Sequence, residues 1–347
     1  MANAEVMIPT ARGDAVSASD LGLVLPTELI IQETAELAIN WPDNSWAARP
    51  EEERIADVVA ILNNAHAAGV GAILDRTIVG IARNIPRMKK IALQTKLNIL
   101  VCTGIYVLYE LPYYFHYRER WPERFSGQPS LADFMVRDIE HGVLDTGVRA
   151  AAIKVVSDRY GIEETPDVRL TFRATSEAHR RTGAPIVTHI HHIDDVHRQQ
   201  QVFADEGVDL SRVVIAHLDR TTPDVPLEEF ERALDRGSYL SFDMWEPQGE
   251  NPVVSDPAGR DINLKRVASL VRKGYKKQIL LSSGWPIAFE DCFPDDFVAD
   301  EGIEPFMSLI KQVIPGLKAL GISDSDIHDM TRTNPQQMLS TVGKGGY

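Results

Sequence analysis

Short apolar segments alternate with longer segments of helical periodicity along most of the chain. Apolar residues that recur three or four positions apart are typical of an amphipathic helix, whereas a short unbroken apolar run is typical of a buried strand. Glycines follow most of the helical segments and are typical helix ends. The expected helices begin at Pro50 and Pro86 or span Leu131–His141, Arg169–Thr182, Val196–Asp205, Leu227–Asp235, Leu264–Lys273, Phe306–Leu320 and Pro335–Leu339. The expected strands begin at Leu21 or span Val70–Asp75, Ile99–Gly104, Ala151–Val156, Pro185–His189, Val213–His217, Tyr239–Asp243 and Ile279–Ser283.

Single helices between consecutive strands are typical of a parallel sheet with helical crossovers. Eight such units in 347 residues favour a closed (β/α)8 TIM barrel of the α/β class over an open sheet. Residues 1–20 are small and polar and are expected to be a lead-in, and residues 21–347 are expected to form one barrel domain. The chain has neither GxGxxG after the first strand nor GxxxxGK[ST], so nucleotide binding is not indicated.

The charge and the cysteine content narrow the class of protein further. With 50 acidic and 36 basic residues the formal charge is −14, which argues against nucleic acid or an anionic membrane as partner. Cys102 and Cys292 are isolated, so neither a disulfide framework nor a thiolate zinc site is indicated. No signal peptide or membrane-spanning apolar run is visible. We therefore expect a soluble cytoplasmic protein.

Three polar residues stand at the ends of apolar segments. Lys154 lies in AAIKVV, His189 follows IVT and His217 follows VVIA. A bare ammonium is costly to bury, so Lys154 is expected to be neutral, paired or modified, unless its stem carries the amine to the surface. The ends of consecutive barrel strands lie close together, so the three side chains are expected to converge. They fit a metal site if the lysine nitrogen becomes a carbamate, and the alternative is that three unrelated polar residues cap strands.

The chain resembles the phosphotriesterase family of the amidohydrolase superfamily, particularly its phosphotriesterase-like lactonases. In that family a carboxylated lysine bridges two metal ions. The resemblance therefore implies that Lys154 is the bridging residue and that His189 and His217 bind the more exposed ion. It extends from about Thr10 to Ser340 and includes TARG, LGLVL, IARNIPRMKKIA, LNILVCTGIY, PYYFHY, IKVVSDRYGI, QVFADEGVDLSRVVIAHLD and TNPQQML.

The chain departs from the family pattern at the other, inner metal. The family ends strand 1 with a His-x-His pair, where this chain has Thr27 and Leu29. It ends strand 8 with Ser-His-Asp, and the aspartate, which handles the proton of the attacking water, is replaced here by Gly284. All three substitutions fall on ligands of one ion, so we interpret the site as remodelled.

The residues that follow two of the strands suggest that the mouth of the barrel, at the carboxyl ends of the strands, is apolar. The lactonases commonly carry arginine after the strand 7 aspartate, where this chain has Met244 and Trp245. The aromatic segment Tyr109–Tyr117 points the same way, although aromatic residues beside a barrel mouth are more often packing residues. The residues predicted to contact substrate are Trp245, Met244, Trp285 and His191.

The function that these observations favour is hydrolysis of a lactone or ester of an apolar small molecule. One divalent ion, with zinc favoured, or none, would be held by Lys154, His189 and His217. By the resemblance, Tyr106 would donate to the developing oxyanion. The candidates for general base are Glu28, Asp243 and His191, but Glu28 can instead pair with a basic residue and Asp243 can brace a histidine.

Two other classes of function stay open. A metal-independent isomerase, lyase or cyclase would use Lys154 as an amine of lowered pKa. A non-catalytic pseudoenzyme would keep the barrel and only bind a small molecule. The resemblance also implies a homodimer.

Overall fold

The computed structural model describes residues 6–33, 39–41, 49–81, 83–158, 161–163, 165–221, 223–245, 257–284, 288–289 and 306–346. Most of the segments outside these ranges follow the carboxyl ends of barrel strands.

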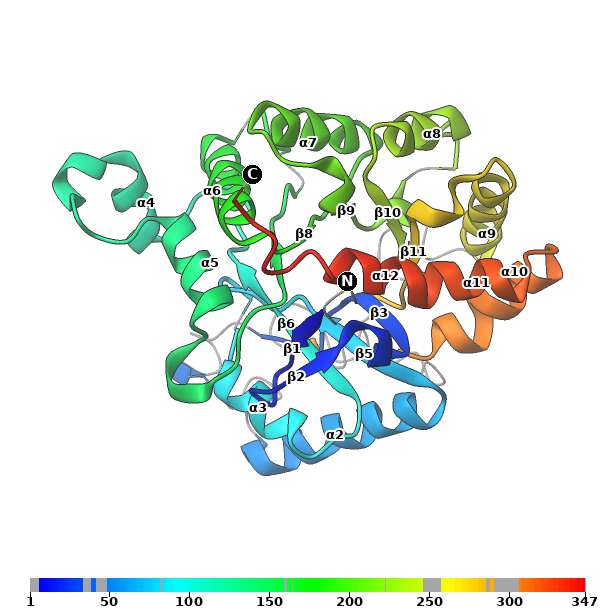
Figure 1. Ribbon diagram of the computed structural model, residues 1–347, viewed down its shortest axis with the longest axis horizontal. Helices are drawn as coiled ribbons and strands as arrows, with labels where there is room; N and C mark the ends of the chain where they lie inside the picture. The colour runs from blue at the N-terminus through cyan, green and yellow to red at the C-terminus, as the bar shows by residue number, and fades with distance from the viewer. Residues whose placement is uncertain are drawn as a thin grey trace, which may run out of the picture.

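Eight parallel strands form the centre of the molecule and follow one another around the sheet in chain order (Figure 1). In register, Lys154 lies beside Gly104 on one side and beside Val187 on the other. The first and last strands approach each other, and Thr27 N donates to Ser282 Oγ at 3.3 Å across this gap. The strands are β3 (Leu23–Glu28), β5 (Val70–Asp75), β6 (Asn98–Gly104), β7 (Ala152–Lys154), β8 (Ile186–Val187), β9 (Val213–Ile215), β10 (Tyr239–Phe242) and β11 (Ile279–Leu281). The predicted (β/α)8 barrel is confirmed, as a nearly closed ring of strands.

Helices surround the ring and occupy the positions that the apolar periodicity predicts (Figure 1). None of those in the described part of the chain combines the length and apolar composition of a membrane span. The helix α4 (Tyr113–Arg120) differs from the rest because it projects away from the barrel and buries none of its residues. The others are α2 (Glu51–Ala67), α3 (Ile85–Ala92), α5 (Leu131–Glu140), α6 (Pro166–Thr182), α7 (Ile193–Asp205), α8 (Leu227–Asp235), α9 (Pro257–Arg272), α10 (Ile314–Ala319), α11 (Asp324–His328) and α12 (Asn334–Leu339).

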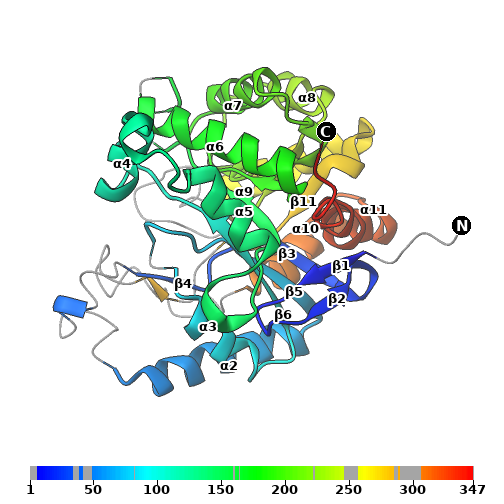
Figure 2. The same ribbon diagram turned by 60° about the vertical axis from the view of Figure 1, so that its left-hand side comes forward.

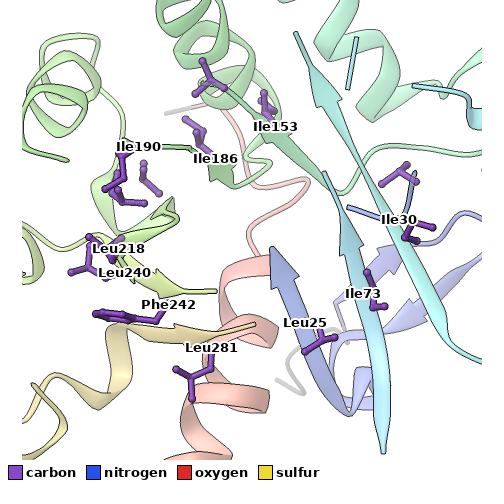
Figure 3. Packing of buried hydrophobic residues seen from close by; sticks show 14 of the residues in the cluster. Leu25, Ile30, Ile73, Ile153, Ile186, Ile190, Leu218, Leu240, Phe242 and Leu281 are labelled. Atoms are coloured by element: carbon purple, nitrogen blue, oxygen red, sulfur yellow. The ribbon is translucent and has the colours of Figure 1, made fainter. Parts of the chain in front are cut away.

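Alternation along the strands divides the core into two layers. On β5, Ala72 and Leu74 belong to the cluster inside the barrel, whereas Ile73 between them belongs to the cluster under the helices. Figure 3 shows members of the outer cluster, including Ile153 and Leu281. Successive side chains of a strand point to opposite faces, so each strand must be apolar on both sides. This explains why the strands read as unbroken apolar runs.

Residues in the expected lead-in form a hairpin of β1 (Met7–Pro9) and β2 (Ala15–Ser17), which lies beside β5 and β6 (Figure 2). Ile8 is fully buried in the inner cluster, and Ala11 N donates to Ile99 O near the start of β6 at 2.7 Å. The hairpin therefore covers the amino-terminal end of the barrel. The polar site residues lie at the opposite end of the barrel. A second short pair of strands, β4 (Ile31–Gln32) and β12 (Ala288–Phe289), is found there too.

Candidate active site

The carboxyl ends of the strands bring the three residues of the sequence hypothesis into one cluster. Lys154 ends β7, His189 lies two residues after β8 and His217 two residues after β9. The two imidazole rings are 4.5 Å apart between centroids and meet edge to face. Tyr106, two residues after β6, lies 6.4 Å from His189, and its ring centroid is 5.4 Å from Lys154 Nζ. Four separate strands thus position these groups.

Lys154 is a buried amine with an altered basicity. Its side chain is only 2% exposed. Burial and the positive charge of nearby Arg76 lower its pKa from 10.5 to about 7, because both disfavour the ammonium. A substantial fraction of Lys154 is therefore neutral at physiological pH.

His217 is held by Asp243 on one side of its ring and by Arg76 on the other. Its Nδ1 lies 2.7 Å from Asp243 Oδ1, and Arg76 Nη1 lies 3.1 Å from its Nε2. A carboxylate only accepts and a guanidinium only donates, so Nδ1 carries the proton and Nε2 accepts. Burial and the charge of Arg76 lower the pKa of His217 well below its usual value, which keeps the ring neutral.

Asp243 braces His217, which was the alternative to its prediction as general base. Its Oδ1 accepts from the His217 ring and also from the His217 backbone N at 3.1 Å, while Oδ2 accepts from Ser241 Oγ at 2.9 Å. The backbone bond fixes His217 in a left-handed conformation with φ of 70°. Both carboxylate oxygens thus have partners inside the protein.

Glu28, another predicted base, joins the first and last strands instead. Its carboxyl is fully buried and interacts with Ser282 Oγ at 2.5 Å, Ser283 N at 2.6 Å and Gly284 N at 2.7 Å. Burial raises its pKa to about 8, although the hydrogen bonds from Ser282 and Ser283 oppose the rise. These contacts leave Glu28 no access to a substrate.

Gly284 cannot carry the side chain that the family has at this place. Its φ is +78°, and an added Cβ would lie 1.6 Å from Asp243 O. The loss of the aspartate is therefore built into the local backbone. We call Thr27, Glu28, Arg76, His217, Asp243 and Ser282–Gly284 the seam side of the mouth.

A second group, which sequence reasoning missed in part, is centred on Asp158. This residue follows β7 in the segment VVSD. Its position just after the strand that carries Lys154 could have identified it as a site residue from the sequence. Its Oδ2 accepts a hydrogen bond from Tyr106 Oη, and its Oδ1 lies 2.9 Å from His191 Nε2. Although burial opposes ionisation, the hydrogen bonds from His191 and Tyr106 lower the pKa of Asp158 well below its usual value.

Arg220 completes this group and was also missed. It ends the short 3-10 helix η7 (Leu218–Arg220), three positions after His217, and is only partly buried. Its Nη1 lies 3.2 Å from His189 Nε2. Burial, with His217 and Arg220 nearby, lowers the pKa of His189 well below its usual value. We call Tyr106, Lys154, Asp158, His189, His191 and Arg220 the open side of the mouth.

The structure places Trp245, which was predicted to contact substrate, in the outer cluster. The indole is 2% exposed, packs in the outer cluster near Phe242, and donates from Nε1 to Phe242 O at 3.1 Å. Met244 is 6% exposed, and its backbone N donates to Asp219. Trp285 lies outside the described residues. The prediction that the barrel mouth is apolar therefore loses its main support, which was Met244 and Trp245.

The aromatic segment also lies elsewhere than expected. Tyr113 and Tyr117 are on the projecting helix α4, with 80% and 38% of their surfaces exposed (Figure 1). Tyr117 stacks on Trp121 at 5.0 Å between ring centroids. These contacts are local to α4 and its continuation, so they do not shape the barrel mouth.

The seam side does not fit a metal ion. Thr27 offers only a hydroxyl, Leu29 and Gly284 offer no ligand, and both ring nitrogens of His217 have protein partners. Arg76 is fully buried beside His217, so its fixed positive charge would repel a divalent cation. His217, which was predicted to bind the ion together with Lys154 and His189, therefore has both ring nitrogens occupied by protein partners.

The open side fits one ion. Asp158, His189 and His191 each offer one ligand atom, and these atoms lie within 4.8 Å of one another. An ionised carboxylate and neutral imidazoles are ligands that zinc accepts, and the lowered pKa values of Asp158 and His189 favour those forms. Because Arg220 covers His189 Nε2, an ion would require Nδ1 of His189 or a shift of the arginine side chain.

The comparisons with known proteins agree with the fold. The phosphotriesterase family model matches residues 6–339. The chain is 37% identical over 342 residues to the phosphotriesterase homology protein of Mycobacterium tuberculosis, covering 97% of this chain and 98% of that protein. It is 27% identical to the aryldialkylphosphatase of Saccharolobus solfataricus, covering 96% and 99%. The solved structure of the phosphotriesterase from Mycobacterium tuberculosis superposes with a TM-score of 0.84 at 36% identity, covering 98% of this chain and 100% of that one.

Proposed function

Since the chain belongs to the phosphotriesterase family, we propose that it is a hydrolase of a lactone or another carboxylic ester. The observation that carries the proposal is the open side, where potential metal ligands, a tyrosine hydroxyl and an amine of lowered pKa lie together. The similarity to an aryldialkylphosphatase supports a hydrolase, because that relative is named for ester cleavage.

One divalent ion, with zinc favoured, would be held by Asp158, His189 and His191. When bound it supplies a Lewis acid and a bound water of lowered pKa. Asp158 also orients its neighbours, because its two oxygens interact with Tyr106 and His191. This arrangement supports a site with one ion in place of the family's two.

Tyr106 would donate to the oxyanion that forms on the ester carbonyl once its one hydroxyl proton turned away from Asp158 Oδ2. Burial and the neighbouring charge of Asp158 raise the pKa of Tyr106, so the hydroxyl keeps its proton. A preorganised donor in a water-poor site contributes more than it would in water. Its ring also packs edge to face against His189, which fixes the position of the hydroxyl.

Lys154 would accept the proton of the attacking water. A general base is most effective when its pKa lies near the working pH, and a pKa of about 7 meets this condition. The carboxylated form of Lys154 that the resemblance implies stays a prediction. A mass gain of roughly 44 Da on this residue would support the carbamate and contradict the free amine.

A metal-independent enzyme is the second candidate, and a specific observation favours it. The Nε2 atoms of both His189 and His217 accept from arginines, at 3.2 Å and 3.1 Å. These contacts occupy the nitrogens that often bind metal ions in proteins. In such an enzyme the neutral amine of Lys154 would act as base or nucleophile.

The test combines metal analysis with hydrolysis assays. Aryl acetates and simple lactones should be hydrolysed by protein that contains about one equivalent of zinc, and chelation should abolish turnover. Full activity without metal would reject the ion and support the second candidate. Absence of hydrolysis of either class, with zinc bound and the protein folded, would reject the proposed function. The homodimer expected from the resemblance stays a prediction.

A further inference from the structure

Two arginines flank the histidine pair at the barrel mouth. Arg76 contacts His217, Arg220 contacts His189, and the two histidine rings touch edge to face. Neither arginine forms an ion pair with a carboxylate of the described chain. This is unusual in a protein with 50 acidic side chains, because a buried guanidinium is normally paired.

Arg76 is held on the seam side by two contacts. It is fully buried, and its Nη2 donates to Thr27 O at 2.6 Å while Nη1 contacts His217. Its Nε is buried and has no hydrogen-bond partner among the described residues. A guanidinium stays charged at every physiological pH, so Arg76 gives the mouth a permanent positive charge that no substrate touches.

Arg220 places a second positive charge on the open side of the mouth. The 3-10 helix η7 ends at Arg220, three positions after His217, which is its N-terminal cap. One of its nitrogens faces His189, and its Nε is buried without a partner in the described chain. The side chain as a whole is only partly buried, so it can reach a ligand.

The charges of Asp158 and Asp219 act on Arg220, but neither carboxylate forms an ion pair with it in the described chain. Asp158 directs Oδ2 to Tyr106 and Oδ1 to His191. Arg220 therefore stands beside His189 on the open side and forms no ion pair with a carboxylate of the described chain. An anionic group that reached it would accept a charge-assisted hydrogen bond.

We propose that Arg220 binds a free carboxylate of the substrate, so that the substrate is a lactone or monoester that also carries an anionic group. The identification of the ester rests on the proposed function, but the anion site does not. A guanidinium matches the oxygens of a carboxylate and of a phosphate alike, so calorimetry with both anions distinguishes them. The overall charge of −14 repels anions, so a local cation is needed to admit one.

The kinetic test compares two esters of equal chain length. One is the nitrophenyl monoester of glutaric acid, which ends in a carboxylate, and the other is the nitrophenyl ester of valeric acid, which ends in a methyl group. We expect the wild type to prefer the anionic ester by about tenfold or more in kcat/KM, the effect of one charge-assisted contact. Arg220→Gln should abolish the preference, and Arg220→Lys should retain part of it.

Arg232→Gln is the matched control, since it removes one positive charge from the exposed surface of α8, where Arg232 pairs with Glu229. It should leave the preference unchanged. Equal rates for the two esters in the wild type would overturn the proposal. A loss in Arg220→Gln that is the same for both esters would also overturn it, because Arg220 would then only orient His189.

A binding measurement separates this proposal from the proposed function. If neither ester is hydrolysed, the hydrolase proposal fails, and calorimetry with glutarate, glutaramide and inorganic phosphate decides the anion site. Glutarate should bind the wild type, and binding should weaken about tenfold in folded Arg220→Gln. Absence of glutarate binding, equal binding of glutaramide, or tighter binding of phosphate would overturn the carboxylate assignment.

Discussion

The seam side and the open side of the barrel mouth use similar residue types in opposite ways. On the seam side, both oxygens of Glu28 and of Asp243 have partners inside the protein, and Arg76 is fully buried. On the open side, His191 and Arg220 are partly exposed. The seam side therefore stabilises the barrel and orients His217, whereas the open side keeps groups available for a substrate or an ion.

The resemblance implies that Thr27 and Gly284 stand where the family has ligands of the inner ion. In this chain Arg76 Nη2 donates to Thr27 O, and Gly284 N donates to Glu28. A guanidinium resembles a metal ion in charge only, because it donates hydrogen bonds and cannot activate water as a Lewis acid.

Lys154→Met should cause the largest loss of activity. Removal of the proposed base should lower kcat by about 10³-fold, within the range of general-base catalysis, while circular dichroism shows an intact fold. Lys90→Met is the control because Lys90 is exposed and pairs only with Glu51 at the surface. Retention of kcat within a few-fold of the wild type would remove Lys154 from the mechanism.

Glu28→Ala should cause the largest loss of stability. It leaves the N–H groups of Ser283 and Gly284 without partners, and we expect a decrease of about 3 kcal/mol in the free energy of unfolding. Urea denaturation measures it, with the exposed Glu53→Ala as control. An unchanged stability together with a lost activity would return Glu28 to the catalytic site.

Asp158→Asn and His217→Asn should differ in metal affinity. Asp158 belongs to the group that fits one ion, so its replacement should weaken zinc binding by about 100-fold, since even residues that only support ligands contribute about 10–100-fold. His217→Asn should retain zinc, because its ring contacts Arg76 and Asp243. Zinc titration of both proteins measures the difference. The reverse result would favour the ligand set that the resemblance implies.

The pH dependence of kcat/KM should report the protonation of Lys154. The free amine is the active form, so the rate should rise about tenfold per pH unit below the pKa of about 7 and level off above it. Initial rates across this range give the profile. A rate that falls as the pH rises through 7 would contradict an unprotonated base.

Trp245→Phe should have the smallest effect, and it should fall on stability. The change removes the hydrogen bond from Nε1 to Phe242 O, so we expect a loss of about 1 kcal/mol in the free energy of unfolding. KM should not change because the indole is buried away from the mouth. A tenfold rise in KM would place Trp245 at the substrate after all.

The sequence by itself determined the barrel and the position of its chemistry along the strands. Unbroken apolar runs and helical periodicity are local properties, and they predicted the eight barrel strands and most of the helices, but not the hairpin of β1 and β2 or helix α4. Parallel strands end on one face, so Lys154, His189 and His217 could be expected together. The missing ligands at Thr27, Leu29 and Gly284 were also visible from the resemblance.

Only the tertiary structure decided what these groups contact. Glu28 and Ser282 are 254 positions apart, so their hydrogen bond depends on the approach of the first and last strands. Trp245 lies beyond the end of β10, where strand alternation no longer fixes which way a side chain points, and it turned to the outer cluster. Nothing in the local sequence distinguishes Arg76 and Arg220 from other loop arginines. The fold places each one against a histidine from another part of the chain. Local pattern fixes where a residue stands along its element, but long-range closure fixes its partners.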